Sequence, residues 1–153
     1  MKEIEGKLSA KGLKVALVAS RFNSFLVEQL VKGAADAYNR LGGDAAGLVL
    51  VRVPGAYEIP VTAKKLAASK KFDAVVGLGA VVQGATAHAA LINETTARAF
   101  TEIALETGVP VVDGVVSAEN LEQAVERCGT KQGNKGFAAV QAAIEAVDVL
   151  RQI

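Results

Sequence analysis

The sequence has few of the residues on which disulfides and metal centres depend. Its 153 residues include one cysteine, Cys128, and one histidine, His88. A lone cysteine cannot form an internal disulfide or a cysteine-rich zinc site. One histidine beside it argues against other transition-metal sites as well. We therefore expect a protein without a resident metal, in a reducing compartment.

Charge of one sign and long apolar runs are also missing. Seventeen Lys and Arg against sixteen Asp and Glu leave a formal net charge of +1. This argues against a partner held by bulk charge, such as nucleic acid or a membrane surface. The sequence contains no run of about 18 apolar residues that would predict a membrane span. Residues 1–14 are charged and lack the apolar run of a signal peptide. We expect one soluble domain over residues 1–153, most simply in the cytoplasm.

Short apolar runs alternate with helical patterns along the chain. The predicted strands are residues 15–19, 48–53, 74–82 and 109–116. The predicted helices are residues 26–41, one from about 58, one from after 86 to about 106, one capped by Ser117 and ending at 125, and one after 136. This order requires right-handed crossovers. It therefore predicts an α/β fold in which helices cover both faces of a four-stranded parallel sheet, a three-layer α/β/α sandwich.

Residues 4–8 have a weak strand alternation but no obvious partner within the chain. A terminal strand without a local partner often adds to the sheet of a neighbouring subunit. We therefore expect this N-terminal strand to pair with a second copy of the chain.

Ligands of open parallel sheets bind beyond the carboxyl ends of the strands. That rule selects the loops at residues 20–23, 54–58, 83–88 and 113–117. In the third loop, the small residues Gly84 and Ala85 would let backbone N–H groups approach an anion. The helix dipole and the hydroxyl of Thr86 would add to the attraction. From the spacing alone, an ordinary turn capped by Thr86 is the better interpretation.

Several side chains near these loops have both a chemical and a structural interpretation. His88 can serve a proton relay near neutral pH, or be a surface histidine. Phe22 can stack on a planar heterocycle or fill the core, and Glu58 can bind a ligand or cap a helix. Arg127 can donate two hydrogen bonds to one phosphate, but a basic residue near a helix C-terminus is also an ordinary partner of the helix dipole. Cys128 is interpreted as structural.

Four motifs occur together, in order, over essentially the whole chain. They are SRFN at residues 20–23, VPGAYEIP at 53–60, GATAH at 84–88 and LEQAVERCGTKQGNKG at 121–136. Together they resemble the lumazine synthase (6,7-dimethyl-8-ribityllumazine synthase) family. The resemblance implies a flavodoxin-like fold and a reaction of riboflavin biosynthesis. That reaction joins 5-amino-6-(D-ribitylamino)uracil to 3,4-dihydroxy-2-butanone 4-phosphate, releasing phosphate and water, without a metal or organic cofactor.

The resemblance also implies roles for the matching residues. His88 would be the acid–base residue and Lys135 an electrostatic helper, while Phe22 would stack on the pyrimidine. Arg127 would reach the phosphate from the adjacent subunit. The other substrate contacts would come from Ala56, Tyr57, Glu58, Ala80, Val81, Val82 and Asp113, and the phosphate turn from Gly84, Ala85 and Thr86.

A site shared between subunits implies an obligate homo-oligomer. The family forms pentamers, and residues 4–8 and the uninterrupted junction at 129–136 resemble members that build sixty-subunit icosahedral shells. Riboflavin synthase is a further implied partner.

The sequence departs from the family pattern at Gln83, Ala89, Ala90, Asp113 and Ala138. These departures motivate an alternative function, a self-assembling shell or flavin- or lumazine-binding protein with weak or no catalysis. A flavodoxin-like electron carrier is a third interpretation.

Overall fold

A parallel sheet forms the centre of the computed structural model, which describes residues 1–85, 87–130 and 133–153. Its strands are β1 (Val15–Ser20), β2 (Leu48–Val53), β3 (Ala74–Val82) and β4 (Val111–Ala118). They lie in the order β2-β1-β3-β4, and each neighbouring pair is parallel. The predicted flavodoxin-like α/β/α architecture is therefore confirmed. Strands β2 and β3 have the predicted bounds, whereas β4 begins and ends two residues later than expected.

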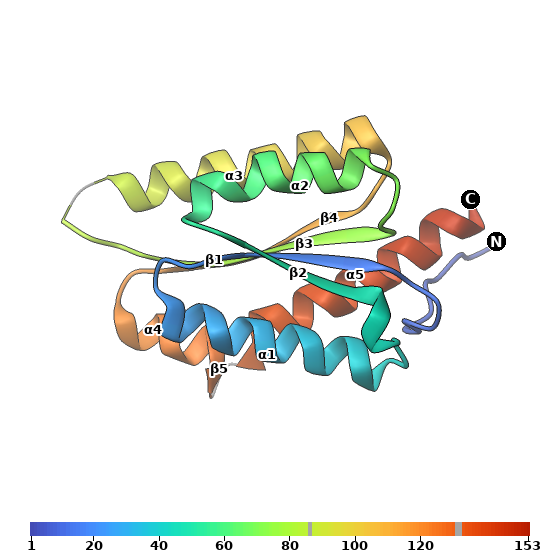
Figure 1. Ribbon diagram of the computed structural model, residues 1–153, viewed down its shortest axis with the longest axis horizontal. Helices are drawn as coiled ribbons and strands as arrows, with labels where there is room; N and C mark the ends of the chain where they lie inside the picture. The colour runs from blue at the N-terminus through green and yellow to red at the C-terminus, as the bar shows by residue number, and fades with distance from the viewer. Residues whose placement is uncertain (86, 131–132) are drawn as a thin grey trace.

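Helices cover both faces of the sheet, as Figure 1 shows. Those above it in that view are α2 (Ile59–Ala68), which follows the short 3-10 turn η2 (Ala56–Glu58), and α3 (His88–Thr107). Those below it are α1 (Ser24–Arg40), α4 (Leu121–Arg127) and α5 (Lys135–Gln152). The remaining elements are the 3-10 turn η1 (Ala45–Gly47) and the antiparallel pair β5 (Cys128–Thr130) and β6 (Gly133–Asn134).

The apolar strands divide the core into two layers because successive side chains of a strand point to opposite faces. Leu17 packs in the cluster with residues of α1 and α5, while its neighbour Val18 packs in the cluster with α2 and α3. The packing of β3 against α2 and α3 requires a glycine at position 77. A Cβ atom there would lie 2.5 Å from Cζ of Phe100. The ring therefore packs directly on the strand backbone.

The expectation that Ser117 caps a helix is wrong. β4 continues to pair with β3 as far as Ala118, so Ser117 lies within the strand, and its Oγ accepts a hydrogen bond from Nδ2 of Asn93 at 2.7 Å. The cap of α4 is Asn120, whose Oδ1 accepts from the N–H of Gln123 at 2.9 Å. The ladder of β3 and β4 thus extends past Ser117, although serine is a common residue at helix N-caps.

The last helix begins at Lys135, slightly earlier than the start predicted after residue 136. Asn134 caps it by accepting from the N–H of Phe137 at 3.0 Å. Its Nδ2 also donates to the carbonyl oxygens of Gln29 and Cys128, at 2.8 and 3.0 Å. One asparagine therefore fixes the start of α5 to α1 and to β5.

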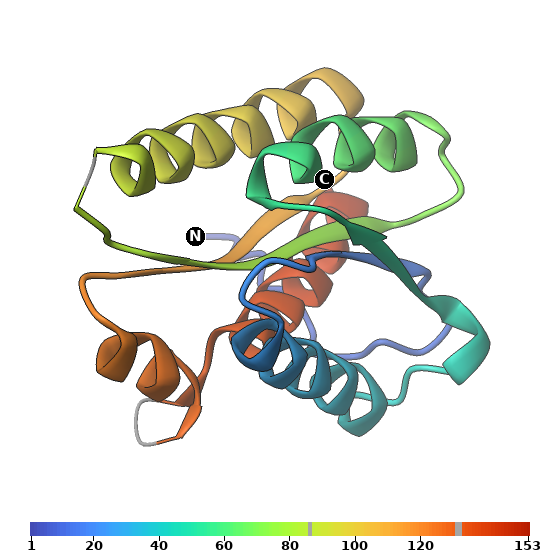
Figure 2. The same cartoon turned by 60° about the vertical axis from the view of Figure 1, so that its left-hand side comes forward.

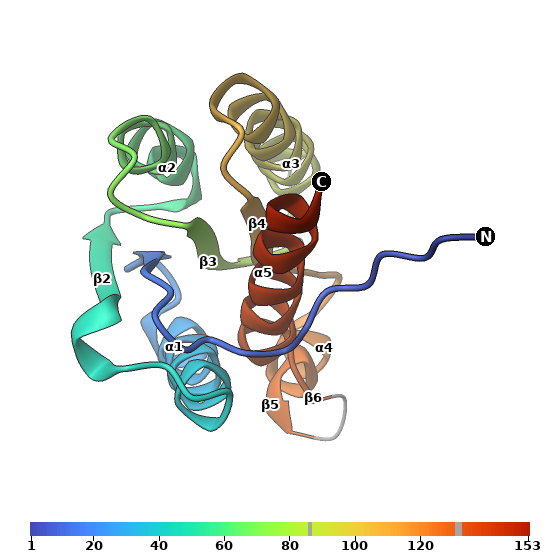
Figure 3. The same ribbon diagram turned by 90° about the vertical axis from the view of Figure 1, so that its right-hand side faces the viewer.

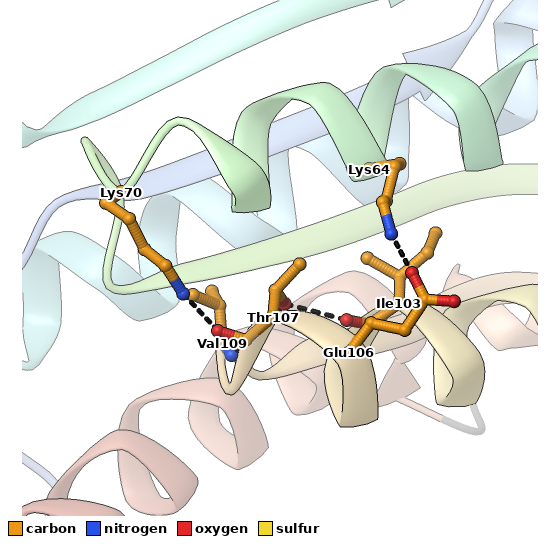
Figure 4. Close-up of polar contacts among 6 residues, drawn as sticks. All are labelled: Lys64, Lys70, Ile103, Glu106, Thr107 and Val109. Atoms are coloured by element: carbon orange, nitrogen blue, oxygen red, sulfur yellow. Dashed lines mark hydrogen bonds and ion pairs between the residues drawn. The ribbon is translucent and has the colours of Figure 1, made fainter.

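Polar contacts at the C-terminal end of α3 join it to α2 and to the turn after α2, as Figure 4 shows. Lys64 forms an ion pair with Glu106, and Lys70 donates to the carbonyl oxygen of Thr107. The hydroxyl of Thr107 donates to the carbonyl oxygen of Ile103 at 2.7 Å. These contacts lie at the opposite end of α3 from His88.

The N-terminal segment crosses α5, as Figure 3 shows, and residues 4–8 form no strand within this chain. The N–H of Lys7 donates to Asp148 Oδ2 at 2.8 Å, and Nε2 of Gln152 donates to the carbonyl oxygen of Glu5 at 2.8 Å. Ile4 and Leu8 remain exposed. Pairing of this segment with a second copy therefore stays a prediction.

Candidate active site

The loops that follow β1, β2 and β3 meet at the carboxyl end of the sheet, on the left in Figure 1. They surround a cavity of about 270 Å³. Its lining residues are Phe22, Asn23, Ala56, Ala80, Val81, Val82, Gly84, His88, Ala89 and Ile92. Seven of the predicted site residues thus come together: Phe22, Ala56, Ala80, Val81, Val82, Gly84 and His88.

The cavity combines an apolar floor with an exposed aromatic ring. Ala80 and Val81, at the end of β3, are 3% and 9% exposed, so they are fixed by the core beneath them. Phe22 is 72% exposed and stands in the β1–α1 turn. Of its two sequence interpretations, filling the core is therefore wrong. A ring in this position is available to stack on a flat ligand.

His88 is the first residue of α3 and forms part of the cavity wall. Its side chain is exposed, and the first turn of α3 contains no acidic residue. The N-terminus of a helix carries a partial positive charge from its free N–H groups. An anion near His88 would therefore be stabilised without competition from a carboxylate in that turn.

The predicted phosphate turn is described only at Gly84 and Ala85, both exposed, because Thr86 lies outside the described residues. Gly84 lines the cavity, and a Cβ atom built on it would meet no atom of the described residues beyond its chain neighbours within 4 Å. Packing against the described residues therefore does not require glycine at this position. The space beside it is open to a ligand.

Tyr57 and Glu58 do not line the cavity, although their neighbour Ala56 does. Oε2 of Glu58 accepts a hydrogen bond from the N–H of Gly55 at 3.0 Å. This is the capping interpretation of Glu58, and it holds the turn that presents Ala56. Tyr57 is 51% exposed at the surface nearby.

Three further predicted residues lie on the free edge of β4. Lys135 donates from Nζ to the carbonyl oxygen of Val115 at 2.5 Å, and Arg127 donates from Nη1 to that of Ser117 at 2.6 Å. Asp113 accepts from the N–H of Val115 through Oδ1 at 2.8 Å. Charged side chains thus satisfy backbone groups for which an edge strand has no partner.

Arg127 and Lys135 line a second cavity, of about 450 Å³, with Gly133, Asn134, Phe137 and Ala138. Among the residues that the structure describes, the two cavities have no lining residue in common. Figure 2 shows the cause, since β3 leads to α3 on one side of the sheet and β4 leads to α4 on the other. Within one chain, the predicted site is therefore divided into two groups of residues.

Sequence reasoning missed Asn23, Ala89 and Ile92 as lining residues of the first cavity. Asn23 belongs to the SRFN motif, but its contact depends on a turn geometry that residue spacing does not reveal. Ala89 and Ile92 follow His88 by one and four residues. The helical period alone would have placed Ile92 on the face of His88.

Cys128 is buried, and burial raises the pKa of its thiol to about 11. The neutral thiol suits the structural interpretation. No group of three or more His, Cys, Asp or Glu side chains in the described residues is placed to hold a metal ion. Nor is any helix of those residues long and apolar enough to cross a membrane.

The fold and the cavity define an α/β protein with a ligand crevice at the carboxyl end of a parallel sheet. The family model for 6,7-dimethyl-8-ribityllumazine synthase matches residues 12–151. The chain is 48% identical over 153 residues to the 6,7-dimethyl-8-ribityllumazine synthase of Nitratidesulfovibrio vulgaris (strain DP4), covering 100% of this chain and 98% of the relative.

The same name belongs to relatives from Syntrophus aciditrophicus (strain SB) and Chlorobium phaeobacteroides (strain DSM 266 / SMG 266 / 2430). The former is 48% identical over 149 residues, with 97% of each chain covered. The latter is 49% identical over 152 residues, which cover 99% of this chain and 98% of the relative. The chain therefore belongs to the 6,7-dimethyl-8-ribityllumazine synthase family, which confirms the family predicted from its motifs.

Proposed function

We propose that this protein condenses 5-amino-6-(D-ribitylamino)uracil with 3,4-dihydroxy-2-butanone 4-phosphate to 6,7-dimethyl-8-ribityllumazine, releasing phosphate and water. Membership of the family over the full chain supports this reaction. The observation that carries the proposal is the first cavity. It brings an exposed aromatic ring, an apolar floor and the chain's one imidazole together at the carboxyl end of the sheet.

Positioning supplies much of the expected rate. The uracil ring stacks on Phe22 above Ala80 and Val81, and the phosphate of the second substrate lies beside Gly84. Two reactants held in a productive geometry react with effective molarities that reach about 10⁵ M or more. The site therefore needs few chemical groups beyond those that bind the two substrates.

His88 moves the protons. The amine of the uracil forms an imine with the ketone and releases one water, phosphate is eliminated, and ring closure releases a second water. Each step adds or removes a proton at nitrogen, carbon or oxygen, and imidazole both donates and accepts protons near neutral pH. Such general acid–base catalysis contributes about 10²–10⁴ in rate.

A second copy of the chain completes the site. Arg127 and Lys135 lie in a separate cavity, so within one chain they do not line the cavity of His88. Two cations on the free edge of β4 suit an anionic substrate held by a neighbouring copy. We propose a pentamer, assembled into a sixty-subunit shell, in which residues 4–8 add to a neighbour's sheet.

We propose that residues 1–153 act as one domain in the cytoplasm, with riboflavin synthase as a partner. The family model spans residues 12–151, which supports one unit. The single cysteine is a buried thiol, which suits a reducing compartment.

The second candidate function is a shell or a flavin- or lumazine-binding protein with weak catalysis. Two observations favour it. Ala89 lines the cavity where the family commonly has a larger side chain, and Asp113 places a negative charge on the edge of β4 that carries Lys135. A binding protein needs the cavity but not His88.

Incubation of the purified protein with both substrates separates the two functions. An active synthase releases phosphate and forms fluorescent lumazine faster than the spontaneous reaction. His88→Ala is then expected to lower the rate about 10²–10⁴-fold toward that background, while Arg98→Ala on the exposed side of α3 does not. Wild-type protein that never exceeds the background, yet binds lumazine, supports the second function.

A further inference from the structure

Asn23 adopts a backbone conformation that residues other than glycine seldom adopt. Its φ is 58° and its ψ is 44°, in the left-handed region. Among the described residues, the one other non-glycine residue with positive φ is Lys70. Residues held in sparsely populated conformations cluster at functional sites, and Asn23 lines the first cavity.

The side chain of Asn23 does not cap the helix that it precedes. Asparagine before a helix ordinarily accepts a hydrogen bond from a free N–H group of the first turn. Here it accepts none, and Nδ2 instead donates to the carbonyl oxygen of Ala80 at 2.8 Å. Ala80 lies two residues beyond Leu78, the last residue of β3 that pairs with β1. The amide thus provides a partner for β3 where β1 has ended.

The same turn is bonded to β2 and to the residue that follows it. The N–H of Arg21 donates to the carbonyl oxygen of Val53 at 2.8 Å, and that of Phe22 donates to Pro54 at 3.1 Å. With the amide of Asn23, these bonds connect the turn to both strands beside β1. The backbone on each side of Phe22 is therefore fixed.

Phe22 itself lacks the packing that orients a buried ring, since it is 72% exposed. Its direction depends on the backbone that carries it. We infer that Asn23 is a positioning residue, whose left-handed backbone and bond to Ala80 hold the Phe22 ring at the cavity in the orientation that stacks on a flat heterocycle. The identity of that heterocycle, the uracil substrate, rests on the proposed function, whereas the orientation of the ring does not.

Two substitutions separate the amide from the backbone conformation. Asn23→Gly enters the left-handed region freely but has no amide. Asn23→Asp keeps the size of the side chain but presents a carboxylate to the carbonyl of Ala80. Lys70→Gly is the matched control, because Lys70 has the same φ of 58° and bonds to Thr107, at the far end of α3 from His88.

The first experiment measures, for wild type and each variant, the KM of both substrates and the Kd of the lumazine product. Product binding is monitored by the fluorescence of lumazine. Asn23→Gly is expected to raise the KM of the uracil substrate and the product Kd roughly five- to tenfold, the usual effect of one lost hydrogen bond. Asn23→Asp raises them further. The KM of the phosphate substrate, and all values for Lys70→Gly, stay unchanged. Equal rises for both substrates, or an unchanged product Kd, would overturn the inference.

The second measurement needs no ligand. In a spectrum of protein with labelled phenylalanine rings, Phe22 is assigned by its loss in Phe22→Leu. Its resonance is expected to broaden or move toward the position of a freely rotating ring in Asn23→Gly, and not in Lys70→Gly. An unchanged Phe22 resonance overturns the positioning role whether or not lumazine is made. A changed resonance in a protein that makes no lumazine overturns the proposed function alone.

Discussion

Lys135 holds its ammonium group on the free edge of β4 by donating to the carbonyl oxygen of Val115 at 2.5 Å. Arg127 does the same at Ser117, at 2.6 Å. Both cations are therefore fixed by backbone bonds, and neither lines the cavity that contains His88. Within one protomer, the two groups of proposed site residues therefore line separate cavities.

Arg127→Ala is expected to raise the KM of the phosphate substrate about tenfold and to leave that of the uracil substrate nearly unchanged. The guanidinium is proposed to bind phosphate, and hydrogen bonds to charged groups contribute about 1.5–3 kcal/mol. Steady-state kinetics with each substrate varied in turn measures the two values. Equal effects on both substrates would contradict a phosphate role.

Asp113→Asn is expected to lower the KM of the phosphate substrate about twofold at low salt. The amide keeps an oxygen that can accept from the N–H of Val115, as Asp113 does at 2.8 Å, but removes a negative charge near the proposed anion site. Added salt should abolish the difference by screening it. Kinetics at two ionic strengths test this, and a KM that rises instead would count against it.

Two glycine substitutions should have opposite consequences. Gly77→Ala places a Cβ atom 2.5 Å from Cζ of Phe100 and should lower the free energy of unfolding by about 1–3 kcal/mol. In Gly84→Ala the new Cβ atom meets no atom of the described residues within 4 Å beyond its chain neighbours, so stability should not fall, while the KM of the phosphate substrate should rise. Denaturant unfolding and kinetics measure both effects. A Gly84→Ala variant with unchanged kinetics would exclude close approach of phosphate to this backbone.

Cys128 should resist alkylation in the native protein at pH 8 and react quickly once unfolded. Burial raises its pKa from the ordinary value of 9.0 to about 11, so little reactive thiolate exists at that pH. This group stabilises the fold below about pH 9, and its contribution is lost as pH rises through about 11, because the unfolded thiol ionises first. Mass spectrometry after timed iodoacetamide treatment measures the reaction. Rapid native labelling would contradict a buried neutral thiol.

The sheet could be predicted from sequence because its strands are apolar on both faces and separated by helical patterns. Strand bounds were accurate where a turn residue ended the run, as Pro54 does after β2. They were wrong for β4, where pairing with β3 extended the strand through Ser117. Local capping preference could not reveal a ladder formed with residues far away in the chain.

The candidate site was predictable to the extent that it follows strand ends. Ala80 and His88 line one cavity because β3 leads directly into the loop before α3. The capping bond of Glu58 to Gly55 and the left-handed backbone of Asn23 depend on turn geometry. The sequence left capping and ligand binding open for Glu58 and did not predict the left-handed backbone of Asn23, although each residue lay within a recognised motif.

Subunit mixing tests the shared site most directly. His88→Ala and Arg127→Ala proteins are unfolded together, reassembled, and assayed at substrate concentrations below KM. If a neighbouring copy supplies Arg127, random mixing gives about one quarter of the sites both intact residues, and activity exceeds the mean of the two separate variants. Activity equal to that mean, in particles shown to contain both variants, would contradict a site built from two copies.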